Sequence, residues 1–361
     1  MRIGLTFNAR SPAKPSCGAT KLSAAARDAL LACDDSEEEF DSLETISALA
    51  DTLRSLGHEV ELLGEGESLI RRLLDGPRPD LVFNIAEGRG VSRSRESRVP
   101  AILETLGIPY TGSDPLSLAV ALDKDCAKRL VAQAGVATPA WVTIDDRWET
   151  APDEVMRQLA ELPLPLVVKP TYEGSSKGIR NKCLVETPAE LRETIAELRG
   201  AYQQPILVEE FIDGDELTVG IVGHPPEVLG IMRVVPTKGT GPFLYSLEIK
   251  RDWVDTIRYE CPAPVSPRAT QRVGQAALAA FRALGCQDVA RVDFRLRDDV
   301  PYFLEANPLP GLAPFTSDLV FLARDVGVDH RELLRRILAG AINRLGRAAP
   351  RTTEPALADR R

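Results

Sequence analysis

The sequence predicts an α/β protein whose N-terminal part is a parallel sheet with helices on its faces. The first 86 residues show the order strand, helix, strand, helix, strand, which is typical of parallel sheets with helical crossovers. The chain has 361 residues, and 44% of them are hydrophobic. That length and composition allow two or three domains with a large buried core.

Local patterns define the N-terminal elements. Residues 1–7 are predicted to form a buried strand, and aliphatic residues then recur at helical spacing between Asp41 and Gly57. We expect Asp41, with Glu44 three residues later, to cap this helix and Gly57 to end it. Two further strands, at 58–63 and 80–86, and a short helix at Leu69–Leu74 complete this part.

A long polar connection interrupts this pattern at residues 8–40, and it contains an acidic run at 34–39 and a predicted helix at Lys21–Ala32. Loops of this length are uncommon, so we expect it to be functional or mobile. The later helices are predicted at Leu116–Leu122, Lys124–Ala134, Pro267–Leu284, Ser317–Arg324 and Arg331–Arg344. The later strands are predicted at Trp141–Ile144, Leu166–Lys169, Pro205–Phe211, Glu216–Val222, Val228–Val235, Val289–Leu296 and Tyr302–Glu305.

Composition excludes several classes of function. The chain has a net charge of −9, whereas a nucleic-acid-binding protein usually carries an excess of basic residues. Only three histidines occur, and the six cysteines show no CxxC spacing, so we expect free thiols in a reducing compartment. No signal peptide and no apolar run long enough to span a membrane is recognisable. These observations predict a cytoplasmic protein that acts on small molecules and has no membrane partner.

Two segments carry polar groups suited to a nucleotide. Lys169 ends a strand and is followed by a Gly/Ser-rich turn up to Gly178, whose backbone N–H groups can bind phosphates. A plain turn is the alternative, because the order of a Walker A loop is absent. Residues 208–216 run from an apolar strand into several carboxylates, and a carboxylate there can bind ribose hydroxyls. A hairpin with solvated acids is the alternative for that segment.

A third cluster predicts a metal site. Arg291 and Asp293 alternate along one strand, and Glu305 and Asn307 alternate along the next, so each pair shares a face. Carboxylate and amide oxygens are the ligands that Mg²⁺ prefers when it also binds phosphates. Chance alternation on an exposed face is disfavoured, because the flanking residues are apolar.

These segments resemble the ATP-grasp enzymes, and among them the D-alanine–D-alanine ligases. Five segments match in the expected order, and the resemblance covers roughly residues 75–340. They are IPYTGS with LDKDCAK (108–128), VVKPTYEGSSKGI (167–179), VEEFIDGDELTVGIVG (208–223), YSLEIKRDW with YECPAPV (245–265), and ARVDF with YFLEANPLPGLAP (290–314). The resemblance implies an α+β ATP-grasp fold of two domains, with the N-terminal sheet as a domain in front of it.

The resemblance also implies domain bounds, ligands and roles. The expected domains are 1–115, 116–208 and 209–345, with a disordered tail at 346–361. ATP and Mg²⁺, with Mn²⁺ as an alternative ion, are the expected cofactors, and a homodimer is the expected assembly. The implied nucleotide contacts are Lys124 and Lys169 for phosphates, Glu209, Glu210, Phe211 and Ile212 for adenine, and Glu216 for ribose. The implied catalytic residues are Arg291, Ser175, Lys250 and Gly311, and the implied metal ligands are Asp293, Glu305 and Asn307.

The implied reaction is ATP-dependent ligation of a carboxylate to an amine. Transfer of the γ-phosphoryl group converts the carboxylate into an acyl phosphate, which is a far better acylating agent. The amine then attacks, and Arg291 stabilises the oxyanion. Closure of the loop 237–255 excludes water from the acyl phosphate. A specialised ligase with other substrates and a catalytically silent ATP-binding protein remain alternatives.

The substrate side departs from the family pattern at several positions. The glutamate that usually holds the first amino group has no obvious counterpart, and Asp41 or Glu44 is a substitute. Glu87 replaces the usual histidine, Arg251 replaces a frequent tyrosine, and Thr316 or Ser317 replaces a serine. An arginine-rich loop, with Arg89, Arg93, Arg95 and Arg98, is either a binding site for an additional carboxylate or phosphate or a solvated loop.

Overall fold

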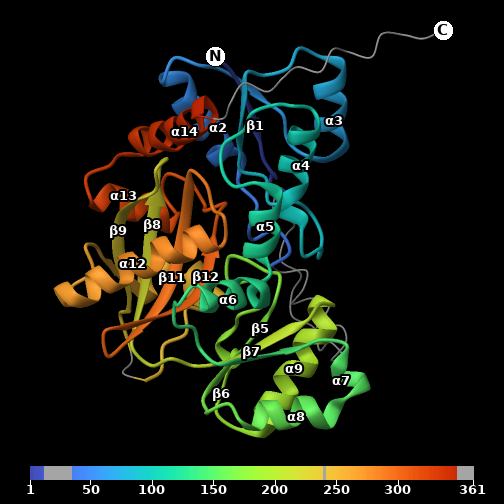
Figure 1. The fold of residues 1–361 in the computed structure, drawn as a ribbon, viewed down its shortest axis with the longest axis vertical. Helices are drawn as coiled ribbons and strands as arrows, with labels where there is room; N and C mark the ends of the chain where they lie inside the picture. Colours follow the sequence, from blue (N-terminus) through green and yellow to red (C-terminus); the bar gives the residue numbers. More distant parts are fainter. Residues whose placement is uncertain (12–34, 239–240, 348–361) are drawn as a thin grey trace.

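Three β-sheets organise the chain in the computed structural model, which describes residues 1–11, 35–238 and 241–347 (Figure 1). The predicted helix at Lys21–Ala32 and all but the first two residues of the predicted tail lie outside these ranges. The four cysteines within them are free. None of the helices in the described ranges combines the length and apolar character needed to cross a membrane.

The N-terminal sheet is parallel, as predicted, with the order β2-β1-β3. Its strands are β1 (Arg2–Thr6), β2 (Glu59–Leu62) and β3 (Leu81–Asn84), and its first two helices are α2 (Leu43–Ser55) and α3 (Gly66–Asp75). The predicted cap of α2 is wrong by one residue, because the hydroxyl of Ser42, and not Asp41, accepts from the N–H of Thr45. The side chain of Asp41 is thereby left for another role.

The second sheet is antiparallel and has the order β4-β7-β5-β6. Its strands are β4 (Trp141–Ile144), β5 (Leu166–Pro170), β6 (Leu184–Val185) and β7 (Ile206–Glu210), and its apolar core includes residues of α8 (Pro152–Ala160) and α9 (Pro188–Tyr202). The sequence analysis missed α9. Its signal was available, because Thr187 and Glu190 form a capping box directly before an apolar periodicity.

The third sheet is antiparallel and has the order β10-β9-β8-β11-β12. Its strands are β8 (Asp215–Val222), β9 (Glu227–Pro236), β10 (Ile257–Glu260), β11 (Val289–Arg297) and β12 (Val300–Asn307). Alternate residues of β8 face opposite layers: Leu217 and Val219 pack with α12 (Pro267–Ala283), whereas Gly220 lies against α13 (Asp318–Asp325). The shorter helices are α4 (Arg98–Thr105), α5 (Pro115–Leu122), α6 (Lys124–Gln133), α7 (Arg147–Thr150), α10 (Leu247–Arg251) and α11 (Trp253–Thr256).

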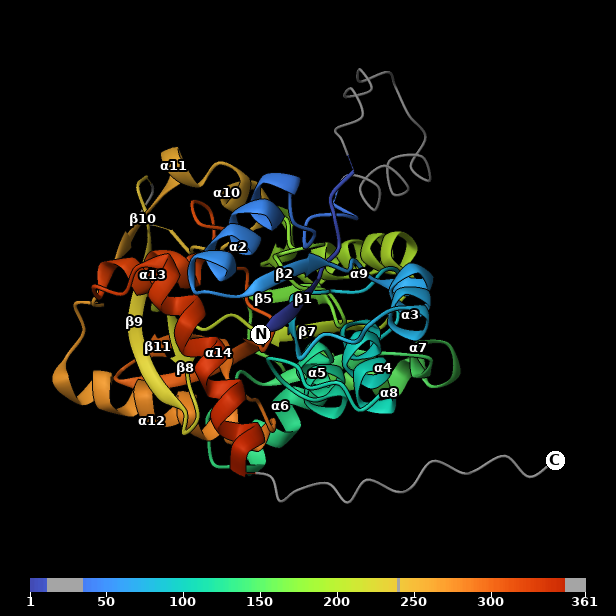
Figure 2. The ribbon, with the colours of Figure 1, turned by 90° about the horizontal axis from the view of Figure 1, so that it is seen from above.

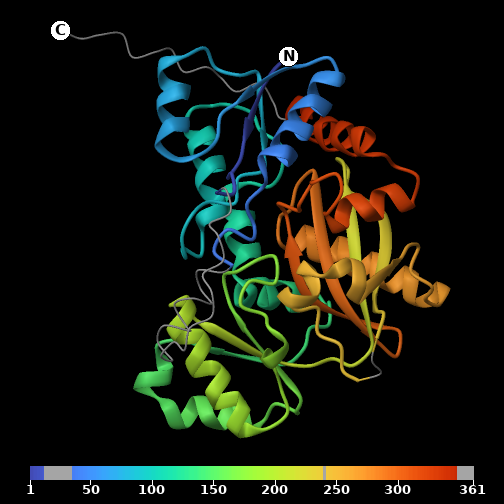
Figure 3. The same cartoon turned by 180° about the vertical axis from the view of Figure 1, so that it is seen from behind.

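The last helix, α14 (His330–Arg347), links the two ends of the chain. Its residues Leu333 and Leu334 belong to the same apolar cluster as Leu49 and Leu53 of α2. Figure 2 shows the two helices near each other. The second and third sheets lie on either side of a junction formed by α5, α6 and the long connections (Figure 3). The candidate site occupies this junction.

Candidate active site

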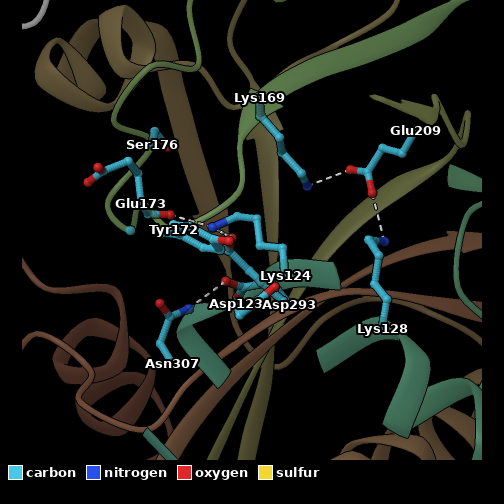
Figure 4. Close-up of polar contacts among 12 residues, drawn as sticks. Asp123, Lys124, Lys128, Lys169, Tyr172, Glu173, Ser176, Glu209, Asp293 and Asn307 are labelled. Carbon is cyan, nitrogen blue, oxygen red and sulfur yellow. Dashed lines mark hydrogen bonds and ion pairs between the residues drawn. The ribbon is translucent and has the colours of Figure 1, made fainter. Parts of the chain in front are cut away.

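The hairpin of β11 and β12 brings the predicted metal-binding residues together. Its antiparallel register pairs Arg291 with Asn307 and Asp293 with Glu305. The guanidinium of Arg291 lies 2.9 Å from Asp293, and the amide of Asn307 lies 3.4 Å from the same carboxylate (Figure 4). The predicted shared faces are therefore confirmed.

The electrostatics of the hairpin favour an ionised Glu305. Burial opposes its ionisation, but the surrounding cations, Lys124 foremost, lower its pKa to about 2. Burial acts more strongly on Asp293, whose pKa is raised although Arg291 opposes the change. Two carboxylates of unequal proton affinity thus lie beside each other, and both offer hard oxygen ligands.

Three buried lysines surround this centre. The Lys124 ammonium lies 3.4 Å from Glu305 and donates to the carbonyl of Glu173. Lys169 and Lys128 approach the two oxygens of Glu209, at 2.5 and 2.7 Å (Figure 4). Lys128 was not among the predicted residues, and burial lowers its pKa to about 8.

The cavity that we call the linker cavity lies between the second and third sheets. Residues 209–212 form one wall, Lys169 and Lys250 line it, and Val167, Ile179 and Leu304 supply apolar surface. Glu216 also lines this cavity and pairs with Arg295 at 3.1 Å, while Glu210 pairs with Arg297 at 3.0 Å. The combination of an apolar slot and buried cations suits a flat, negatively charged ligand.

A second cavity, the central cavity, adjoins the predicted metal-binding residues. Lys124, Arg291, Glu305 and Asn307 line one side, and Ser175 and Gly311 line it as well. Ser175 has a φ of +50° within the Gly/Ser-rich turn. Four acidic residues also line this cavity and form what we call the acidic wall: Glu39, Glu87, Glu96 and Glu173.

Glu39 is the most important residue that the sequence analysis missed. Its carboxylate accepts from the N–H of Gly174 at 2.7 Å and pairs with Arg95 at 2.7 Å and Lys177 at 3.1 Å. Burial opposes its ionisation, but the two cations outweigh burial and lower its pKa. A Cβ atom at position 174 would lie 2.7 Å from a Glu39 oxygen, so a side chain there would displace the Glu39 carboxylate from this position. In the sequence, only its place in the acidic run at 34–39 pointed to this residue.

The predicted solvated loop describes three of the four arginines, because Arg89, Arg93 and Arg98 are exposed, but it does not describe Arg95. Arg95 is 1% exposed and is held between Glu39 and Glu173, so it is not solvated. Arg93 pairs with Asp123 at 2.7 Å, Arg89 pairs with Glu65 at 3.1 Å, and the guanidinium of Arg98 donates to the carbonyl of Arg89. Three of these four arginines thus form ion pairs with carboxylates of the protein itself.

A third cavity, the inner cavity, continues from the central one and shares Glu39, Glu87 and residues 308–311 with it. Asp41, Asn84 and Thr111 line its far side. Glu44 is exposed on α2 and lines none of these cavities. Of the two predicted substitutes for the missing glutamate, only Asp41 reaches a cavity.

The segment after β9 covers the site. Lys250 lines the linker cavity, and Arg251 pairs with Glu38 at 2.8 Å. The hydroxyl of Tyr245 lies 2.9 Å from that of Tyr259, which in turn donates to Asp318, a partner of Arg291. Thr316 is exposed, and the hydroxyl of Ser317 accepts from the N–H of Ala313.

Comparisons with known proteins agree with this geometry. Residues 130–339 match the family described as D-ala D-ala ligase C-terminus. The D-alanine–D-alanine ligase of Aquifex aeolicus is 34% identical over 304 residues, covering 84% of this chain and 96% of that one. The corresponding ligase of Synechococcus sp. (strain JA-3-3Ab) is 34% identical over 331 residues, covering 90% and 97%.

A solved structure shows the same fold. The D-alanine–D-alanine ligase of Bacillus anthracis, complexed with ATP, superposes with a TM-score of 0.65 at 24% identity and covers 95% of this chain and 98% of its own. Together with the family match and the two relatives, this likeness confirms the ATP-grasp fold that the motifs implied. The chain belongs to the D-alanine–D-alanine ligase family.

Proposed function

We propose that the protein is an ATP-dependent ligase that joins two amino acids through an acyl phosphate, with release of ADP and phosphate. The observation that carries the proposal is the position of Asp293, Glu305 and Asn307. This oxygen cluster lies at the junction of the linker and central cavities and is flanked by the buried Lys124 and Lys169. A phosphoryl group bound there would face both a nucleotide and an acceptor carboxylate.

The residues present fit a nucleotide and a divalent ion. Residues 209–212 would contact adenine, Glu216 the ribose, and Lys124 and Lys169 the phosphates. Asp293, Glu305 and Asn307 would hold Mg²⁺, or Mn²⁺ in its place, because their oxygens are hard ligands. The bound ion neutralises the phosphate charge during transfer.

The residues of the chain account for each step that follows. The donor carboxylate attacks the γ-phosphorus atom, ADP leaves, and an acyl phosphate forms. The amine of the second substrate attacks the acyl carbon, where Arg291 and the N–H of Gly311 would stabilise the oxyanion, and phosphate leaves. Lys250 would close the phosphate side of the site, and Ser175 would position the donor.

On the substrate side, Glu39 is our candidate for the group that binds the first ammonium, because it lines both the central and inner cavities. Glu87 lines the same two cavities. Ser317 is a better candidate than Thr316, since a Cβ atom on Gly311 would lie 2.8 Å from its hydroxyl. Arg251 would hold the segment after β9 in its closed position through its ion pair with Glu38, rather than contact the substrate.

The proposal also includes the location of the protein, its oligomeric state and its domain bounds. We propose a cytoplasmic homodimer, supported by the family resemblance, and light scattering of the purified protein tests its mass. The three sheets support domain bounds at 1–115, 116–208 and 209–345. The packing of α14 against α2 shows that the last of these segments also contributes to the core of the first.

The test is ADP and phosphate release with ATP, Mg²⁺ and single or paired D- and L-amino acids, with the products identified by mass spectrometry. We expect stoichiometric ADP, phosphate and one dipeptide for at least one pair. Release of ADP without any peptide, or no release with any pair, would contradict the proposal. The second outcome would favour a silent ATP-binding protein.

A further inference from the structure

The inner cavity contains polar groups that the described residues leave unsatisfied. Asn84 is 4% exposed, and its amide nitrogen has no hydrogen-bond partner, although its oxygen accepts from the Thr6 hydroxyl. The carboxylates of Asp41 and Glu87 also make no ion pair or side-chain hydrogen bond with any residue in the described ranges. Unpaired buried polar groups are costly, so such a wall is expected to serve a ligand.

The charge balance of the wall points to a cationic ligand. Arg95 and Lys177 each form an ion pair with both Glu39 and Glu173, so two cations balance these two acids. Asp41, Glu87 and Glu96 remain as surplus acids around the two cavities. Burial is the main reason why the pKa of Asp41 rises to about 6 and that of Glu96 to about 8. A single α-ammonium group beside Glu39 would leave Asp41 and Glu87, on the wall of the inner cavity, without a cationic partner.

We propose that the donor amino acid carries a second ammonium group on a short side chain, bound in the inner cavity between Asp41 and Glu87. The inference rests on the proposed ligase function, with the donor carboxylate beside Lys124 in the central cavity. The α-ammonium would then lie near Glu39, where the two cavities meet. Asn84 would hydrogen-bond polar atoms or water next to the second ammonium group.

Two other occupants fit the wall less well. An alanine methyl group would satisfy neither the Asn84 amide nor the Asp41 carboxylate. A metal ion could use Glu39, Glu87 and Glu96, whose ligand atoms lie within 4.8 Å of one another. However, the Arg95 guanidinium, which pairs with Glu39, would repel a divalent ion at that place more strongly than an ammonium group.

The experiment compares donors that differ only in side-chain charge. Each of 2,3-diaminopropionate, 2,4-diaminobutyrate, ornithine and lysine, in both D and L forms, is paired with D-alanine as acceptor, with alanine and norvaline as neutral donors. Phosphate release gives kcat/KM, and mass spectrometry of the dipeptide shows which amino acid supplied the acyl group. We expect one diamino acid to exceed its neutral counterpart at least about tenfold in kcat/KM.

Two variants test the assignment. Asp41→Asn should reduce the ratio of kcat/KM values, diamino donor over neutral donor, at least about tenfold, while Asp51→Asn on the exposed face of α2 should leave it unchanged. Ligation of neutral donors with equal or higher efficiency, or a ratio that Asp41→Asn does not change, would overturn this inference and leave the proposed function intact. Absence of ATP-dependent ligation with every pair would overturn both.

Discussion

The guanidinium of Arg251 lies 2.8 Å from the carboxylate of Glu38, a residue 213 positions earlier in the chain. This ion pair connects α10, in the segment that covers the linker cavity, to the acidic run next to Glu39. The run itself is anchored to the Gly/Ser-rich turn, because Asp35 accepts from the N–H of Gly178 and Glu39 from that of Gly174. These contacts thus link the segment after β9, the Gly/Ser-rich turn and the acidic residues of the central cavity.

Breaking this ion pair should loosen the cover without removing any group from the cavities. We expect Arg251→Gln and Glu38→Gln each to raise the fraction of ATP hydrolysed without ligation about two- to fivefold, since a partly exposed ion pair contributes only about 0.5–1 kcal/mol. The measurement is the ratio of phosphate to dipeptide. The double variant should be no worse than either single one, and additive effects would show that the two residues act separately.

Removing the two carboxylates proposed to bind the metal ion should separate chemistry from folding. The double variant Asp293→Asn, Glu305→Gln is expected to lower kcat by at least about 10³ while changing the melting temperature by only a few degrees. Asp298→Asn, in the exposed turn of the same hairpin, is the matched control and should retain activity. Retention of turnover in the double variant would disprove the metal assignment.

Glu39 should be important for stability as well as for binding. Glu39→Gln leaves Arg95 with Glu173 as its remaining carboxylate partner in the ion-pair cluster, at 3.4 Å, in a place where the arginine is almost fully buried. Loss of one partner of a buried ion pair typically costs about 3–5 kcal/mol, and we expect a value near the lower end. Urea unfolding measures it, and Glu38→Gln, at the neighbouring and more exposed position, should cost less than about 1 kcal/mol. An equal loss of unfolding free energy in the two variants would show that the buried ion pairs of Glu39 stabilise the protein no more than the partly exposed pair of Glu38.

Asp41 should destabilise the empty protein at neutral pH. Burial raises its folded pKa to about 6 from an ordinary value of 3.8, so the folded state binds the proton more tightly than the unfolded state. Its contribution to stability is therefore lost as the pH rises from about 4 to about 6. We expect Asp41→Asn to stabilise the protein by up to about 3 kcal/mol above pH 7 and by nothing near pH 4. Unfolding curves at both pH values, without substrates, provide the check, and a pH-independent difference would contradict it.

The sequence was informative where a function depends on local alternation. The shared face of Arg291 and Asp293, and that of Glu305 and Asn307, could be predicted because each pair follows the alternation of a single strand. The register that places Asp293 opposite Glu305 was not predicted. The parallel N-terminal sheet followed from the order of its elements in the same way. The five motifs also indicated the family correctly, since each is contiguous in the chain.

The contacts of the acidic residues in the central cavity could not be predicted, because their partners are distant in sequence. Glu39 contacts Gly174 and Arg95 across 135 and 56 residues, and no local pattern indicates either contact. The same applies to Arg95, whose position in a charged, turn-rich loop suggested solvent exposure although it is among the most buried side chains. The capping box of α9, by contrast, was a local signal that the sequence analysis overlooked.

The central claim is that the donor carboxylate, and not water, accepts the γ-phosphoryl group. The most direct test uses a donor amino acid labelled with ¹⁸O in its carboxylate, with mass spectrometry of the released phosphate. We predict one ¹⁸O atom in each phosphate formed together with a dipeptide. The amine attacks the acyl carbon and the carbon–oxygen bond of the acyl phosphate breaks, so the donor oxygen stays on the released phosphate. Phosphate without label in the presence of dipeptide, or AMP in place of ADP, would contradict the account.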